Sequence, residues 1–139
     1  MRGEKGMDLI WDKMWSVGVD KIDRQHKELF NRINLLVCSM KSAKGKEEMI
    51  TTLNFLEEYV IRHFNDEEEI QKKNNYPNYE IQHKEHEIFK NNLKELRKVF
   101  ETTGVSTLFV ISEQQKMSYW WRKHVIELDK DIGKFLMDV

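Results

Sequence analysis

The chain has 139 residues, of which 34% are charged, and its formal net charge is -1. This length fits one domain, residues 1–139, with a single hydrophobic core. Because acidic and basic residues are interspersed, the sequence lacks the one-signed charge that nucleic acids or anionic membranes attract, and we expect no nucleic-acid partner.

The cellular location is predicted from the one cysteine and from the apolar segments. Cys38 lies in an apolar run and has no second cysteine to pair with, which favours a buried thiol in a reducing compartment. Residues 1–11 lack the apolar segment of a signal peptide, and no run approaches the roughly 20 apolar residues that a membrane helix needs. We therefore expect a cytoplasmic protein with no membrane partner.

The first half of the chain predicts an arm and two helices. Residues 1–18 are not clearly helical, and we expect this N-terminal arm, with Trp11 and Trp15, to pack across the helices. A helix over about 20–42 has inward positions at three- and four-residue spacing, namely Ile22, His26, Leu29, Ile33, Leu36 and Met40. A second helix over about 46–73 continues this pattern with Met49, Leu53, Leu56, Val60, His63, Glu67 and Ile70.

The second half predicts two more helices. A turn around Pro77 separates the second helix from a third over about 78–101, whose inward positions are His86, Phe89, Leu93, Leu96 and Phe100. A fourth helix over about 106–137 has the inward positions Val110, Met117, Trp120 or Trp121, His124, Leu128, Ile132 and Phe135. Four amphipathic helices with short loops predict an all-α fold, an up-down-up-down four-helix bundle with an N-terminal arm.

The inward stripes place a histidine on every helix and a carboxylate on the second. Burying an uncompensated carboxylate costs several kcal/mol and each unpaired imidazole roughly 1 to 3 kcal/mol more, so this axis predicts bound cations. His63 and Glu67, four residues apart on one face, suit a site for two ions. Iron and zinc are both compatible with these ligands, and a carboxylate-rich bundle core favours iron and oxygen chemistry. Asp129 follows His124 by five positions, about 140° round an ideal helix, so spacing alone does not select it.

Four stretches taken together resemble the bacterial hemerythrin family over nearly the whole chain. They are "IWDKMWSVGVDKIDRQHKELF", "HFNDEE", "YPNYEIQHKEHEIF" and "WWRKHVIELD". The resemblance implies two iron ions joined by an oxo or hydroxo bridge and reversible binding of dioxygen. It further implies that His26 and His63 bind one iron, that His86 and His124 bind the other, and that Glu67 and Asp129 bridge both.

The third helix departs from the family pattern, which is H-x-x-x-H. Gln82 stands at the first of those positions and His83 follows it. On a straight helix Gln82 lies about 40° to one side of His86 and His83 about 60° to the other, so the geometry leaves both open. Imidazole is the better iron ligand, and we favour His83, reached through a local bulge of the helix. A weak or water-mediated Gln82 and a site without this ligand are the alternatives.

The resemblance implies an oxygen-binding protein for storage, delivery, scavenging or sensing rather than an enzyme. Phe30, Phe64 and Trp120 are candidates to line a dry oxygen pocket, with plain core packing as the alternative for each. Rival hypotheses are a di-iron redox enzyme that reduces peroxide or nitric oxide, a sensory module for a separate signalling partner, and a bundle that binds zinc or a single metal without redox chemistry.

Overall fold

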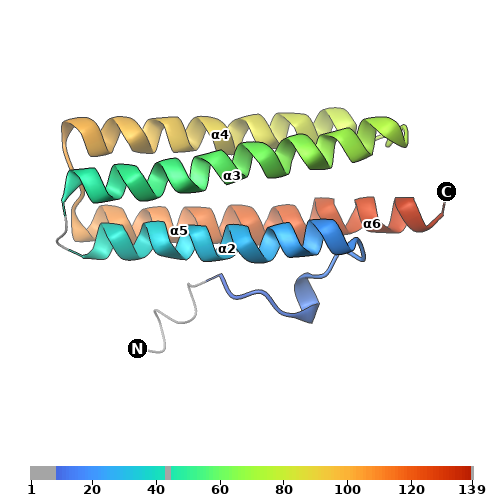
Figure 1. Ribbon diagram of the computed structural model, residues 1–139, viewed down its shortest axis with the longest axis horizontal. Coiled ribbons are helices and arrows are strands. Elements are labelled where there is room, and N and C mark those ends of the chain that lie inside the picture. Colours follow the sequence, from blue (N-terminus) through green and yellow to red (C-terminus); the bar gives the residue numbers. More distant parts are fainter. Residues whose placement is uncertain (1–8, 43–44, 139) are drawn as a thin grey trace.

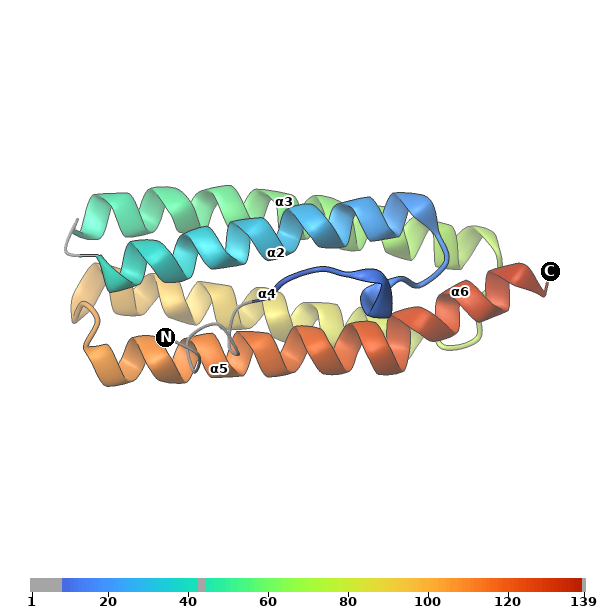
Figure 2. The ribbon, with the colours of Figure 1, turned by 90° about the horizontal axis from the view of Figure 1, so that it is seen from below.

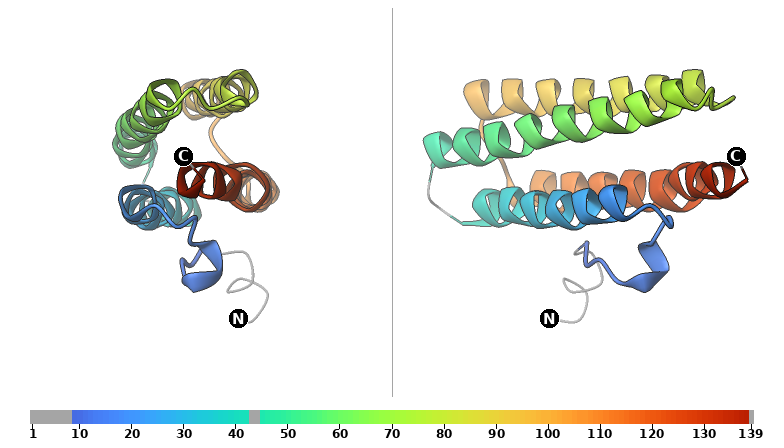
Figure 3. Two further views of the ribbon diagram at one scale, coloured as in Figure 1. Left: turned by 90° about the vertical axis from the view of Figure 1, so that its right-hand side faces the viewer. Right: turned by 45° about the vertical axis from the view of Figure 1, so that its right-hand side comes forward.

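The computed structural model of the chain describes residues 9–42 and 45–138. Its long rods are α2 (Asp20–Lys41), α3 (Lys46–Lys73), α4 (Tyr79–Thr102) and a fourth that comprises α5 (Thr107–Lys123), η2 (His124–Asp129) and α6 (Lys130–Met137). Successive rods run antiparallel (Figure 1), and an end-on view shows them around one axis (Figure 3). The predicted up-down-up-down four-helix bundle is thereby confirmed.

The turn between α3 and α4 is closed by backbone hydrogen bonds that end α3 sharply. Asn75 has φ 56°, the left-handed conformation that terminates many helices. The Tyr76 N–H donates to the Gln71 carbonyl at 2.9 Å, and the Asn75 N–H donates to the Lys72 carbonyl at 3.2 Å. Because this turn is tight, α4 returns directly alongside α3, and the polar residues of the two helices face each other.

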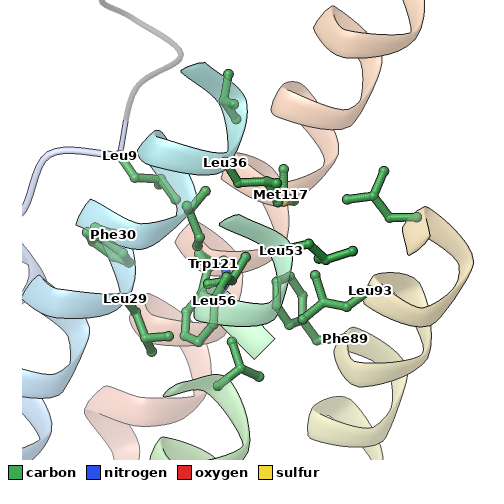
Figure 4. Close-up of a cluster of buried hydrophobic side chains, with 14 of the residues drawn as sticks. Leu9, Leu29, Phe30, Leu36, Leu53, Leu56, Phe89, Leu93, Met117 and Trp121 are labelled. Atoms are coloured by element: carbon green, nitrogen blue, oxygen red, sulfur yellow. The ribbon is translucent and has the colours of Figure 1, made fainter. Parts of the chain in front are cut away.

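The hydrophobic core contains most of the inward positions that the helical periodicity predicts, together with Phe30 and Phe64, which lie outside the predicted stripes. Its largest fully buried side chains include Trp121, Phe30, Phe64, Phe89 and Phe100, which lie among buried leucines of the arm and of α2, α3 and α4. Figure 4 shows this packing, with Trp121 between the leucines of α2 and those of α3. The core is therefore aromatic at its centre, where a polar site needs walls that keep water out.

The fourth rod is not the continuous α-helix that we expected. Residues His124–Asp129 form η2, a π-helix with one extra residue in its turn. The expected inward position Leu128 is only half-buried, whereas Val125 and Asp129 are fully buried. The extra residue shifts the inward position from Leu128 to Asp129, a shift that the 3.6-residue period of an α-helix does not predict.

The N-terminal arm lies over the line between α2 and α5 (Figure 2). Leu9 is buried, and its backbone N–H and carbonyl both pair with the Asn34 side chain of α2. The Trp15 ring meets Phe30 edge-on, with 4.9 Å between centroids. The arm thus packs across the helices from residue 9 onward, while residues 1–8 of the predicted arm lie outside the described part of the chain.

Two expectations about exposure have different outcomes. Cys38 is exposed, so the prediction of a buried thiol is wrong; it projects from the outer face of α2, where the apolar run around it does not determine burial. Within residues 9–42 and 45–138, no helix combines the length and the hydropathy that spanning a bilayer requires.

Candidate metal centre

Four imidazoles, one from each rod, meet at the axis of the bundle. His26 comes from α2, His63 from α3, His86 from α4 and His124 from the start of η2. All four are buried, and each is at most 2% exposed. The Nε2 atoms of His86 and His124 lie only 3.2 Å apart. These nitrogens converge on a common point although the residues are far apart in sequence.

Glu67 of α3 spans the space between the two pairs of histidines. Its Oε1 lies 3.1 Å from Nε2 of His86 and 3.9 Å from Nε2 of His124. Its Oε2 lies 3.4 Å from Nε2 of His63 and 4.0 Å from Nε2 of His26. One carboxylate oxygen therefore faces each pair, which is the arrangement of a bridging ligand between two cations.

Asp129 spans the same two pairs from the opposite side. Its Oδ2 lies 3.1 Å from Nε2 of His26, and its Oδ1 lies 3.2 Å from Nε2 of His124. The π-helix explains how it does so, because the extra residue in the turn brings His124 and Asp129 to one face although they are five apart. The helical wheel did not select Asp129, and the structure places it in the site.

These donors fall into two groups that share Glu67. In each group every residue offers one ligand atom, and these atoms lie within 4.8 Å of one another. The groups are His26, His63, Glu67 and Asp129, and Glu67, His86 and His124. Both oxygens of Glu67, Oδ2 of Asp129 and Nε2 of His63 are buried without a hydrogen-bond partner. Such atoms are costly to bury unless something binds them. The donor set and its unpaired atoms therefore fit a pair of cations.

The charge distribution supports the same conclusion. Burial lowers the pKa of His63 to about 3, so its ring is neutral and its Nε2 lone pair is available. Burial also lowers the pKa of His124, but the negative charges of Asp129 and Glu67 beside it outweigh burial and raise that pKa to about 10. This raised pKa keeps a proton on His124, and the positive charge compensates the two carboxylates as a cation in the site would.

Hydrogen bonds fix the ring of His63, and sequence reasoning missed them. Its Nδ1 donates to Oε1 of Gln25 at 2.8 Å, and Nε2 of Gln25 donates to Oδ2 of Asp66 at 2.8 Å. This relay leaves Nε2 of His63 as the atom that faces the centre, as outer partners of metal-binding histidines do. Gln25 precedes His26 and lies off the inward stripe, so periodicity offered no signal for it.

His83 does not join the donors. Its Nδ1 pairs with Oε1 of Glu68 at 2.9 Å, its ring stacks on Tyr79, and its side chain is 42% exposed. Oε2 of Glu68 in turn accepts from Nδ1 of His86 at 2.7 Å. The expected bulge of the third helix is absent, because α4 is an unbroken α-helix from Tyr79 to Thr102. Glu68, which the sequence stripe passed over, thus links His83 to the ring of His86.

Gln82 occupies the inward position that precedes His86 by one turn. It is fully buried, and its Nε2 donates to Oδ1 of Asp129 at 3.1 Å. Its Oε1 is buried without a partner. Gln82 therefore lies at the centre and holds the carboxylate of Asp129 through its amide N–H.

Aromatic rings cover the centre on the side of the main core. Phe30 lies parallel to His26, Phe64 stacks on His86 with 3.8 Å between centroids, and Trp120 stacks on His124 at 4.4 Å. The candidate pocket residues are thus all beside the ligands, although Trp120 is half-buried. Trp121, absent from the predicted pocket, is fully buried with its ring about 6 Å from three of the four imidazoles.

Fold and site together define a four-helix-bundle protein with two groups of buried histidine and carboxylate donors, a set able to hold two cations. The sequence model of the hemerythrin HHE cation binding domain matches residues 17–133. The chain belongs to the hemerythrin family, whose domain binds a non-heme di-iron centre, and its paired donor groups are able to hold two metal ions.

Individual relatives agree with this assignment. The chain is 28% identical to a myohemerythrin of Sipunculus nudus over 69% of its length and 74% of the relative's. It is 29% identical to a bacteriohemerythrin of Stenotrophomonas maltophilia over 67% of its length and 60% of the relative's. A crystal structure of wild-type hemerythrin superposes with a TM-score of 0.81 at 24% identity, covering 92% of this chain and 97% of that one, which supports the fold.

Proposed function

We propose that this chain binds dioxygen reversibly at a di-iron centre whose ligands are His26, His63, His86, His124, Glu67 and Asp129. The observation that carries the proposal is the division of both carboxylates between the two histidine pairs in a site closed to solvent. When bound, the iron pair supplies the two electrons that reversible uptake of dioxygen requires.

The aromatic residues have the task of keeping the centre dry. Phe30 and Trp121 close the side of His26, and Phe64 covers the rings of His63 and His86. Apolar walls exclude water and so slow the loss of reduced oxygen species to solvent, which favours release of the gas itself. Phe30, Phe64 and Trp120 remain our proposed pocket residues, with Trp121 added.

The outer hydrogen bonds have the task of holding the ligands in place. Gln25 and Glu68 each accept from an Nδ1–H, which directs the Nε2 atoms of His63 and His86 inward. With tautomers and ring angles fixed in advance, the rings need not reorganise when the redox state of the centre changes. In this proposal His83 acts on the centre only through Glu68.

The test is an anaerobic reduction of iron-loaded protein followed by admission of air. We expect two irons per chain and a visible band that appears with oxygen and disappears when oxygen is removed. Replacement of Glu67 by glutamine is the matched loss variant, because it keeps the shape but removes the bridging charge. A native protein that contains zinc, or iron that oxidises without any reversible band, refutes the proposal.

A second candidate function is a di-iron redox enzyme that reduces peroxide or nitric oxide. The observation that favours it is Gln82, which leaves the side of His86 and His124 without a third imidazole. Sustained turnover with a reductant, together with rapid bleaching of any oxygenated form, distinguishes the enzyme from the carrier. The proposed cytoplasmic location rests on the unpaired Cys38, and cell fractionation tests it.

A further inference from the structure

Both halves of the proposed di-iron centre receive the same kinds of donor from the protein. One half has the Nε2 atoms of His26 and His63, and the other has those of His86 and His124. Glu67 and Asp129 each direct one oxygen toward each half. Two histidines with carboxylate oxygens are a donor set that leaves positions open on iron. Neither half is therefore closed by the protein alone.

The two halves differ in what lies beside them. Gln82 is one helical turn before His86 on α4, and Gln71 is one turn beyond Glu67 on α3. Because α3 and α4 are antiparallel and Glu67 contacts His86, both glutamines lie in the layer next to the centre, toward the α3–α4 turn. The opposite side of the centre, toward the main core, is covered by Phe30, Phe64 and Trp121.

The two amides at this end are buried and incompletely bonded. Gln71 and Gln82 are both fully buried. Neither side-chain polar atom of Gln71 has a partner, and neither does Oε1 of Gln82. Leaving such groups unpaired costs roughly 1 to 3 kcal/mol each. A small ligand that both donates and accepts hydrogen bonds relieves this cost, because it pairs with Oε1 of Gln82 and with Nε2 of Gln71.

The net charge of the site favours a ligand that is also negatively charged, and hydroxide is one that both donates and accepts hydrogen bonds. Two ferrous or ferric ions bring at least four positive charges, while Glu67 and Asp129 bring two negative charges. An anion or hydroxide near these amides reduces the remaining positive charge in a medium where unbalanced charge is costly. An apolar gas gains nothing from the amides and is better placed against the aromatic side.

We propose that the iron held by His86 and His124 has an exchangeable coordination position, occupied by water, hydroxide or a small anion and flanked by Gln82 and Gln71. The inference rests on the di-iron centre of the proposed function. It assigns to Gln82 a place beside the ligand rather than in the coordination shell, with its N–H holding Asp129. The centre then takes a polar ligand at one iron, in addition to the gas-binding position.

Azide is a suitable probe, because it is a small anion that binds ferric iron and changes its visible absorption. Titration calorimetry and the visible spectrum of the oxidised, iron-loaded protein give the number of azides bound per centre. We expect two for the wild-type chain and one for Gln82→His, whose imidazole fills the second position. Azide accepts hydrogen bonds but donates none, so Gln71→Leu removes its donor, Nε2 of Gln71, and we expect about tenfold weaker binding of the second azide at equal iron content.

Ile81→His is the matched control, because residue 81 is 52% exposed and an imidazole there points away from the centre. It is expected to bind two azides, as the wild type does. A chain that binds two irons but only one azide, both as wild type and as Gln82→His, overturns this inference alone. If the wild type binds one azide and Gln82→Ala loses iron to a chelator faster than the wild type does, Gln82 is a direct iron ligand. That result also overturns the inference. An iron content below two, measured before azide is added, overturns the proposed function and this inference together.

Discussion

Substitution of Gly133 by alanine tests whether the N-terminal arm packs tightly on the bundle at Val17. A Cβ atom at this position of α6 lies 1.7 Å from the carbonyl oxygen of Val17 and 2.9 Å from its carbonyl carbon. Side-chain carbons essentially never approach other atoms closer than 3.0 Å, so the arm or the helix must move by more than an ångström. The obstacle is backbone, which yields less readily than the end of a flexible side chain.

Hydrogen bonds hold the arm at this point, and they determine how much stability the substitution removes. One oxygen of Asp23 accepts from the Ser16 hydroxyl at 2.6 Å, and the other accepts from the Val17 N–H at 2.9 Å. Overpacking costs about 1 to 3 kcal/mol, and loss of a hydrogen bond to a charged group adds about 1.5 to 3 kcal/mol. Alanine recovers about 1 kcal/mol of helix propensity. We expect a net loss of about 2 to 4 kcal/mol in the free energy of unfolding.

Urea unfolding of the iron-loaded protein measures this loss, and a double-mutant cycle with Asp23→Ala shows its origin. Once Asp23 no longer holds the arm, Gly133→Ala is expected to cost much less. The displaced arm also uncovers Phe30 beside His26, so any oxygenated form is expected to decay faster. A gain of about 1 kcal/mol, the ordinary effect of this exchange in a free helix, refutes the proposed arm contact.

Three further predictions concern the centre and its surroundings. Gln25→Leu removes the acceptor of His63 Nδ1, so iron affinity is expected to fall about 10- to 100-fold in chelator competition; an unchanged affinity contradicts the orienting role. Removal of iron is expected to lower the melting temperature, because free iron at 100 times its Kd stabilises the folded chain by about 2.7 kcal/mol; equal melting with and without chelator counts against a native centre. Burial raises the pKa of Glu68, but hydrogen bonds from His86 and His83 outweigh it and lower that pKa to about 2. In metal-free protein its contribution is therefore complete above the ordinary carboxyl pKa of 4.5 and is lost as the pH falls toward 2. Acid unfolding curves of wild type and Glu68→Gln are expected to differ near pH 6 and to converge near pH 2, and parallel curves refute this account.

The bundle was predictable because its core residues recur at helical spacing. His26, His63, His86 and His124 fall on these stripes, and each is buried where the stripe places it. Their convergence followed from the topology, since four inward residues in one layer of an antiparallel bundle must meet. Local periodicity was sufficient because these residues lie on regular α-helix or at its end.

The remaining features depend on contacts that no local pattern contains. Gln25 and Glu68 lie beside the inward stripes, and their roles arise only from histidines on neighbouring helices. His83 was favoured as a ligand for the chemistry of imidazole, yet regular α-helix directs it to Glu68 and solvent. Choosing between Gln82 and His83 required the rotation of α4 relative to α3, which only the packed structure supplies.

The π-helix in the fourth rod brings His124 and Asp129 to the same face, as a shared site for two cations requires. His124 directs its Nε2 toward one half of the centre, and Asp129 must reach both halves. In a regular α-helix the residue four after His124 is Leu128, and Asp129 turns away from the axis. One extra residue in the turn rotates Asp129 inward while α6 still packs its Ile132 in the core. Since π turns are rare and frequently lie at functional sites, the π turn between His124 and Asp129 supports the cation site that we propose there.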